Sequence, residues 1–561
     1  MIKPLFILIL LFTISSTLQS QNLEGLSSQK PVLLSGGLTA RTIFYDANGI
    51  PNRRQPFSYI FTGSPTISIF NSFTIPLVFT YSEQDRSFRQ PFNQFGMSPY
   101  YKWITIHAGY RNINYSQFTL AGHTFLGAGV DLHPGIFRLG FIAGRFNRAT
   151  PVDTSVKSFQ PYTYSNHGIA GKIGIGKGVN FFELSMLKAK DDSTSVHPAK
   201  EFKNTITPAE NIVIGINGQV KFLKDFTFAL EAATSLYTRN LNNNTPLSDS
   251  SNKGFTKILG NFINTNSTTE RYNAIQASLM YHEKVFSAKL QYRRVDPDYK
   301  TMGAYFFNND IENITFAPSL NLLKNKFRFG GSIGFQHDNL KKQKQTTSSR
   351  VIGSANLSTD FTDHFGIDFS YSNYSNTQLR KTILLGNTFR IAQVSENYSF
   401  TPRYILATEK YVHSLIFSAN YNVFSSVDKT IDNLSDTRSK NYFLNYQITL
   451  VPKNLTYTFN LNYIDVKSAS YEDGNYGVTL GANKVLNNSK LTLGWLGSFL
   501  KGLHGKSTGL ILNQNVTVNY RISKHHSFGT TLSYINNKSQ QTLITPSYSE
   551  WQADLNYRYV F

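Results

Sequence analysis

An alternation of apolar and polar side chains with a period of two residues constrains this chain more than any other feature, because it recurs to the last residue. In the final segment one face is apolar or aromatic: Trp551, Ala553, Leu555, Tyr557, Tyr559 and Phe561. The residues between them are polar, except Val560: Glu550, Gln552, Asp554, Asn556 and Arg558. Successive side chains of a β-strand point to opposite sides, so the segment is predicted to be a strand with one apolar and one hydrated face.

The same alternation appears in earlier segments, among them 211–222, 365–372, 455–463 and 527–534. Their second face carries Gly, Ser, Asn, Thr and charged residues, which suits a water-filled lumen, whereas the first face suits lipid acyl chains. Each segment has about 9 to 13 residues, the length that a tilted strand needs to cross a bilayer. A strand of a soluble sandwich alternates in the same way, but repetition along the chain favours an all-β transmembrane barrel.

The predicted barrel is one large antiparallel sheet of about 26 strands, with roughly 22 as the lower bound. It must be closed, since an open edge in lipid would leave backbone N–H and C=O groups without partners. Short turns alternate with longer polar loops. The short turns fall near 133–135, 177–178, 223–225, 282–284, 324–326, 362–364, 408–410, 452–454, 487–489 and 523–526, and the longer loops include 239–269, 339–348, 427–439 and 538–548. This asymmetry predicts short turns and both termini in the periplasm and long loops outside the cell.

Residues 1–20 are predicted to be a signal peptide, because a positive start and an apolar run at 5–14 are followed by small polar residues. The run is too short to span a bilayer, which takes about 20 residues, and this disfavours an N-terminal membrane anchor. Residues 21–32 are then a short periplasmic segment, and 33–561 the barrel. A plug domain like that of the TonB-dependent transporters does not fit before a first strand that begins near Leu33.

Composition and net charge limit the kinds of partner that the chain is expected to bind. Aromatic residues are 14% and charged residues only 16%, whereas average globular proteins carry about 25% charged residues. The net charge of +21 would suit nucleic acid, but export argues against that partner. Five cationic residues are predicted to face the lumen: Arg138, Lys289, Arg293, Arg328 and Arg558. They form a ring that selects anions, or they are balanced by lumen carboxylates such as Glu231, Asp368 and Asp554.

No motif points to catalysis. Gly330 to Gly334 matches G-x-S-x-G, but a nucleophile elbow needs a strand-to-helix turn, and these residues lie within an alternating strand. The adjacent pair His525 and His526 falls in a predicted short turn, without converging metal ligands. The chain has no cysteine, which excludes disulfides and thiolate metal sites. We therefore expect no enzyme activity, no cofactor and no metal.

The C-terminal aromatic residues resemble a known signal. Tyr557, Tyr559 and the terminal Phe561 are similar to the C-terminal β-signal of outer-membrane barrels, and the resemblance implies recognition by the barrel-assembly machinery. The Ser-Gln end of the signal peptide, the high Tyr and Asn content and the basic charge resemble barrels of the Bacteroidota.

The expected function is that of a porin-like channel or carrier for small solutes or lipids across the outer membrane. The alternative is a structural or assembly component of an outer-membrane secretion or barrel-assembly complex. Expected partners are outer-membrane lipids, lipopolysaccharide, the assembly machinery and other outer-membrane subunits.

Overall fold

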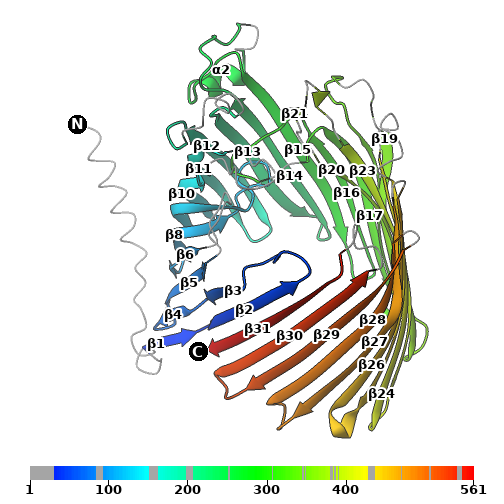
Figure 1. Cartoon of the computed structure of the whole chain (residues 1–561). Coiled ribbons are helices and arrows are strands. Elements are labelled where there is room, and N and C mark those ends of the chain that lie inside the picture. The colour runs from blue at the N-terminus through cyan, green and yellow to red at the C-terminus, as the bar shows by residue number, and fades with distance from the viewer. Residues whose placement is uncertain are drawn as a thin grey trace.

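One antiparallel sheet curls round and closes on itself (Figure 1). The computed structural model describes residues 31–83, 93–150, 162–196, 206–249, 253–305, 308–343, 347, 349–378, 383–384, 387–388, 391–426, 436–468, 471–504, 507–539 and 546–561. The predicted signal peptide lies outside them. The barrel closes where β2 (Gly37–Asn48) pairs with the last strand, β31 (Tyr548–Val560), along the whole length of β2. The predicted pairing of the last strand with the first is confirmed.

The closed sheet has 26 strands, as predicted, when interrupted strands are counted once. Between β2 and β31 lie β3 (Phe57–Gly63), β5 (Phe73–Ser82), β6 (Gln94–Met97), β7 (Tyr100–Tyr101), β8 (Ile104–Ile113), β9 (His123–Leu132), β10 (Phe137–Asn147), β11 (Ser165–Lys177), β12 (Asn180–Asp192), β13 (Glu210–Phe222), β14 (Phe226–Thr238), β15 (Thr269–His282), β16 (Phe286–Val295), β17 (Ile311–Leu322), β18 (Phe327–His337), β19 (Ser349–Asp360), β20 (Phe365–Gln378), β23 (Ile391–Ala407), β24 (Tyr411–Ser426), β25 (Thr437–Leu450), β26 (Leu455–Ser468), β27 (Glu472–Leu486), β28 (Leu491–His504), β29 (Ser507–Arg521) and β30 (His526–Ser539). The short strands β1 (Val32–Ser35) and β4 (Thr66–Ile69) extend β2 and β3, and β21 (Ile383–Leu384) pairs only with β22 (Asn387–Thr388). Among the described residues the helical segments are α2 (Phe255–Gly260) and the 3-10 turns η3 (Leu323–Asn325) and η5 (Val451–Lys453).

Proline interrupts the first strands, which explains why this region is hard to read from sequence. Pro65 separates β3 from β4, and Pro99 separates β6 from β7. Proline has no N–H to donate to a β-ladder and is found at strand edges or irregularities. The regular alternation of the later strands is therefore absent there.

The predicted asymmetry of the connections is confirmed. Connections such as 178–179, 223–225 and 487–490 are short and lie at the end of the barrel where β2 begins and β31 ends. In the last of these, Asn487 and Asn488 adopt left-handed φ angles of 52° and 51°, which Asn tolerates better than most residues. Both ends of the described chain therefore lie at the short-turn end of the barrel.

The outer face of the barrel is apolar, as the alternation predicts. In β26 the outward side chains of Tyr457, Phe459, Leu461 and Tyr463 are 48%, 38%, 41% and 41% exposed to solvent. Ile212 in β13 also faces outward, but it is fully buried. The prediction that Ile212 contacts acyl chains is wrong, because Leu259 of α2 and the following Ile263 cover it.

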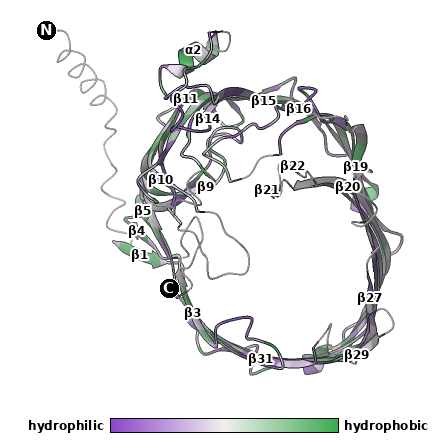
Figure 2. Ribbon diagram, turned by 45° about the horizontal axis from the view of Figure 1, so that its top comes forward, coloured by the Kyte–Doolittle hydropathy of each residue, from purple (hydrophilic) through white to green (hydrophobic). Residues whose placement is uncertain are grey.

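The main apolar core lies inside the barrel rather than between two sheets. Coil segments run inside the ring beside β9, β10 and β14 (Figure 2). The core contains Phe118 and Leu120 from one such segment and Tyr299 from another, packed against the inward residues of neighbouring strands. Each fully buried side chain of this size contributes about 1.5–3 kcal/mol relative to exposure. These loops therefore dock firmly against one part of the lumen wall.

Candidate functional site

The lumen face of the barrel is identified by its contacts with a loop that folds inward after β8. Glu231 in β14 accepts hydrogen bonds from Ser116 Oγ at 2.6 Å, from the backbone N–H of Gln117 at 2.6 Å and from Gln117 Nε2 at 2.7 Å. Side chains that share its side of the sheet therefore face the lumen. Glu231 lies on the predicted face, but it binds a loop rather than a cation.

A second loop, between β16 and β17, pairs with the first. Tyr299 donates its hydroxyl to the carbonyl of Phe118 at 2.6 Å, and Thr301 Oγ1 donates to the carbonyl of Thr119 at 2.7 Å. A Cβ atom at Gly303 would lie 2.5 Å from the Thr119 carbonyl oxygen, so this close approach requires glycine. We call residues 114–122 and 296–305 together the loop layer.

The loop layer is bound to the lumen wall by polar as well as apolar contacts. Ser235 Oγ in β14 donates to the carbonyl of Lys300 at 2.6 Å. The side-chain oxygen of Asn211 in β13 accepts from the backbone N–H of Met302 at 3.0 Å. We call the wall from β9 to β15, which the loop layer covers, the covered wall.

The lumen face of the remaining strands carries many neutral amides and hydroxyls that pair across neighbouring strands. Asn462 Nδ2 donates to Thr479 Oγ1 at 3.2 Å, and Asn515 Nδ2 donates to Ser533 Oγ at 3.0 Å. Other cross-strand pairs are Thr401–Ser418, Asn445–Asn460 and Thr479–Ser498. On the same face Asn483, Asn519 and Asn556 are exposed. We call this surface, from β17 to β31, the open wall.

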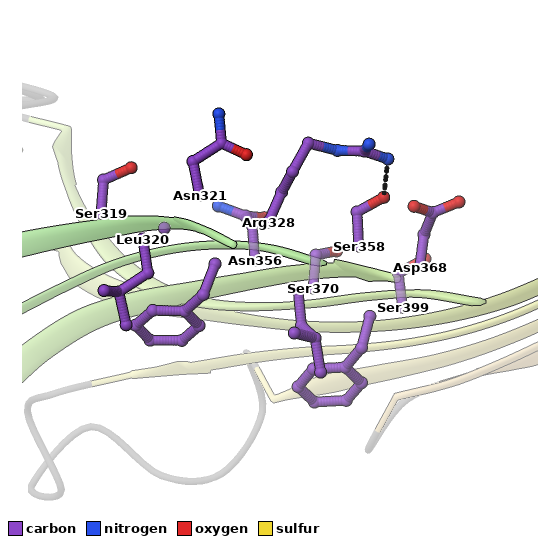
Figure 3. A pocket seen from close by; sticks show the side chains of 13 residues that line it. Ser319, Leu320, Asn321, Arg328, Asn356, Ser358, Asp368, Ser370 and Ser399 are labelled. Carbon is purple, nitrogen blue, oxygen red and sulfur yellow. Dashed lines mark hydrogen bonds between the residues drawn. The ribbon is translucent and has the colours of Figure 1, made fainter. Parts of the chain in front are cut away.

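A depression of about 450 Å³ lies on the open wall at β17 to β20. Figure 3 shows Asn321, Arg328 and Asp368 on one side of the sheet and Leu320 on the other. The polar side is lined mainly by hydroxyl and amide groups, with one guanidinium and one carboxylate. Gly330 contributes to the hollow, because a Cβ atom placed there would meet no atom within 4 Å. The depression offers several hydrogen-bond donors and acceptors to a polar solute.

The structure places the five predicted cations on the lumen face of their strands. Arg138 Nε donates to Glu183 at 2.6 Å, and Arg328 donates to Ser358 at 2.6 Å and to Asp360 at 3.3 Å. Arg293 NH1 donates to the side-chain oxygens of Gln117 and Gln276, both at 2.9 Å. Lys289 shares the inward face of β16 with Arg293. Arg558 shares the inward face of β31 with Asp554. Selection of anions by these residues stays a prediction.

Three further lumen cations were missed from sequence. Arg41 pairs with Asp554, and Arg403 pairs with both Asp360 and Asp368. Lys172 lies 4.0 Å from Asp131 and 3.9 Å from Glu183. Alternation alone puts such residues on the lumen face, but only the strand register shows which carboxylate each one meets. The carboxylates named in the second interpretation meet other groups, since Asp368 pairs with Arg403, Asp554 pairs with Arg41 and Glu231 binds the loop after β8.

A buried chain of hydrogen bonds joins Ser98, His107 and Asp131 in the lumen wall. Ser98 Oγ lies 2.8 Å from His107 Nδ1, and His107 Nε2 lies 3.0 Å from Asp131 Oδ2. These residue types occur in hydrolases, but an attacking hydroxyl must reach its substrate, and Ser98 is only 6% exposed. We therefore assign these three hydrogen-bonded residues a structural role in the lumen wall. Nearby, burial raises the pKa of the Tyr115 phenol.

The C-terminal aromatic residues lie at the seam of the barrel. Tyr557 is bonded to His526 Nδ1 through its hydroxyl at 2.6 Å, and the ring of Tyr559 lies edge-on to that of Phe561 at 5.0 Å. The backbone N–H of Phe561 donates to the carbonyl of Gly36 at 3.1 Å. These contacts continue the closure between the first and last strands. Recognition of the three residues as an assembly signal stays a prediction.

The remaining motifs have structural roles. Ser332 lies inside β18, as predicted, and its Oγ is 3.0 Å from Ser354 Oγ. His525 Nδ1 donates to the carbonyl of Val560 at 2.8 Å. Within the part of the chain that the structure describes, no group of three or more His, Cys, Asp or Glu residues could hold a metal ion. No helix of the described residues is long and apolar enough to cross a membrane.

Comparisons with known proteins give structural likeness only. No protein-family model matches the chain, and no curated protein matches it in sequence. The chain is similar to the ferric yersiniabactin uptake receptor of Yersinia pestis, with a TM-score of 0.41 and 11% identity over 95% of this chain and 81% of the receptor. It is also similar to the FrpB iron transporter of Neisseria meningitidis, with a TM-score of 0.39 and 9% identity over 94% of this chain and 81% of the transporter. The translocation pore of the P pilus usher is similar too, with a TM-score of 0.37 and 10% identity over 94% of this chain and 99% of the usher pore. At these values the fold rests on the chain's own strand pairing.

Proposed function

We propose that the chain is an outer-membrane channel for small hydrophilic solutes. Its outer face carries exposed aromatic and aliphatic side chains, as acyl chains require, and its lumen face is polar. The observation that carries the proposal is the open wall: Asn483, Asn519 and Asn556 are exposed there, whereas the loop layer packs on the covered wall. The loop layer narrows the lumen, so a solute passes along the open wall.

The chemistry of the open wall favours uncharged solutes rich in hydroxyl groups. Amide and hydroxyl side chains both donate and accept hydrogen bonds, and they recur across successive strands of the wall. Many weak sites of similar strength allow a solute to enter and also to leave. The depression that contains Asn321, Arg328 and Asp368 brings several such groups together. We place the main solute contact there.

The proposal includes export and assembly. Residues 1–20 act as a signal peptide, and Tyr557, Tyr559 and Phe561 act as the signal read by the barrel-assembly machinery. The short turns and both termini then lie in the periplasm, and the long loops face outward among lipopolysaccharide. The composition supports a source among the Bacteroidota.

Conductance tests the proposal. The purified mature chain is reconstituted in planar bilayers, and ion current and liposome swelling in sugars of increasing size are measured. We expect steady conductance that Asn519→Trp lowers, because Asn519 is exposed on the open wall. Val516→Trp is the matched control, since Val516 lies on the outer face of the same strand and is 39% exposed. A folded barrel without current or swelling would overturn the proposal and favour the assembly role, which co-purification of native subunits would then identify.

A further inference from the structure

The loop between β14 and β15 packs against the outside of the barrel instead of extending into solvent. Figure 2 shows α2 outside the ring of strands. Leu259 of α2 and Ile263 are 1% and 8% exposed, and they pack on Ile212 and Leu236, which are fully buried. We call residues 253–263 the outer foot.

Polar contacts hold the outer foot in place. The backbone N–H of Asn264 donates to Glu210 Oε2 at 3.0 Å, and Thr238 Oγ1 donates to the carbonyl of Asn264 at 2.8 Å. Glu210 in turn lies 3.8 Å from Lys188 Nζ. The residues just after the foot are therefore fixed to β13 and β14, and the position of the foot is built into the fold.

The other side of the outer foot is apolar and exposed. Phe255, Ile258 and Phe262 are 60%, 56% and 53% exposed. Phe255 and Ile258 belong to α2 and Phe262 follows it, and their side chains are exposed whereas those of Leu259 and Ile263 are buried against the strands. An exposed apolar patch on a fixed element marks an interaction surface.

The strand register fixes the level of this surface on the barrel. Ile212 is paired with Lys188 on one side and with Leu236 on the other, and Leu236 is paired with Arg271. The row therefore carries a cation on each side of the foot, and Arg271 is exposed. One strand beyond Lys188, the row continues to Ile169, an outward residue that is 39% exposed. The foot is thus continuous with the apolar outer face and is flanked by cations.

We propose that the outer foot is a membrane-interface element that inserts Phe255, Ile258 and Phe262 among the acyl chains of the outward leaflet and binds anionic lipid phosphates through Lys257 and Arg271. Apolar side chains beside Lys and Arg are the combination that binds lipid interfaces, and each cation near an anionic surface strengthens the attachment. Lys253 and Lys257 of the foot are both exposed. The inference rests on the proposed membrane location and adds a lipid site that a channel does not itself require.

The absence of cysteine from the chain makes a site-specific test simple. Ile258→Cys in the mature full-length chain is labelled with an environment-sensitive fluorophore and reconstituted in phosphatidylcholine vesicles containing brominated lipid. We expect a blue-shifted emission that the bromine quenches. Tyr457→Cys on the outer apolar face is the positive control for insertion, and Asn244→Cys, an exposed position in the same long loop, is the water-exposed control.

The outcomes separate the two proposals. If the Tyr457→Cys label is quenched while the Ile258→Cys label behaves like the Asn244→Cys label, the barrel is in the bilayer and the foot is not, which overturns this inference alone. If no label is quenched, the membrane location fails as well. A label on Ile258→Cys that is shielded only in native membranes and not in vesicles indicates a protein occupant and also overturns the inference.

A second arm tests the phosphate contacts. We expect added phosphatidylglycerol to increase quenching of the Ile258→Cys label, and the pair Lys257→Gln and Arg271→Gln to abolish the increase. Quenching that is unaffected by anionic lipid would overturn the phosphate contacts.

Discussion

The hydroxyl of Tyr299 donates a hydrogen bond of 2.6 Å to the carbonyl oxygen of Phe118, and this bond joins the two loops that fold into the lumen. The two residues are 181 positions apart in the chain and both are buried. The bond holds the loop layer together inside the lumen.

Replacing Tyr299 by Phe is expected to loosen the loop layer without unfolding the barrel. The change removes the hydroxyl that donates to the Phe118 carbonyl, and a hydrogen bond of this kind contributes about 0.5–1.5 kcal/mol. Single-channel recordings should show more frequent transitions to higher conductance. Tyr457→Phe, which removes an exposed hydroxyl on the outer face, should leave the recordings unchanged. Equally frequent transitions in both variants would contradict the role of the Tyr299 hydroxyl in holding the loop layer.

Gly303→Val is expected to displace the second loop and raise the mean conductance. The added Cβ would lie 2.5 Å from the Thr119 carbonyl oxygen and 2.6 Å from Leu187 Cδ1, so the loop must move. Gly171→Ala on the outer face of β11 is the matched control, because its added Cβ would lie no closer than 3.4 Å to its nearest neighbour, the Gly140 carbonyl oxygen. Hydrogen exchange across residues 114–122 should increase only in Gly303→Val. Equal protection in both variants would show that the loop layer is not packed as described.

Alkaline pH is expected to release the loop layer. Burial raises the pKa of the Tyr299 phenol above its ordinary value of 10.0 and does the same for Tyr115. The docked state favours the neutral phenols, so their contribution is fully present below pH 10 and is lost as the pH rises toward the raised pKa values. Conductance should therefore be constant below pH 10 and rise above it. Tyr299→Phe should weaken this response, and a transition at neutral pH would assign it to other groups.

Arg403→Gln is expected to shift the channel toward cations. Arg403 pairs with Asp360 and Asp368 in the lumen, and its removal leaves more uncompensated negative charge facing the solute path. The reversal potential in a salt gradient measures the shift. Arg145→Gln is the control, because Arg145 is on the outer face, where NH2 donates to the Tyr110 hydroxyl. Equal shifts would mean that the ion pairs lie outside the conducting path.

The two faces of the last strand can be compared within one experiment. Leu555→Arg places a cation on the outer face, which costs about 2–4 kcal/mol near the bilayer midplane, and should lower the amount of protein in the membrane fraction. Arg558→Ala removes a hydrated lumen charge and should be mild. Deletion of Phe561 should also reduce insertion, since it removes the terminal ring at the seam. The reverse ranking of Leu555→Arg and Arg558→Ala would invert the assigned faces.

The barrel itself was determined by local sequence. A period of two residues is a property of each strand alone, so the outward faces of Tyr457 and Phe459 and the lumen face of Arg328 could be predicted without knowledge of their neighbours. The strand number and closure followed, because unpaired backbone groups cannot remain in lipid. The prediction was weakest before residue 125, a stretch in which Pro65 and Pro99 interrupt the ladder.

Only the tertiary structure decided what fills and flanks the lumen. The loops at 114–122 and 296–305 have ordinary polar loop sequences, and their docking depends on closure of the sheet, which brings Phe118 and Tyr299 together. The pair of Arg41 and Asp554, 513 positions apart, exists for the same reason. The outer foot buries Ile212 although the alternation of β13 assigns that residue to lipid. A residue's face is set by its own strand, whereas its partner is set by the register and by loops from distant parts of the chain, and those contacts carry no local pattern.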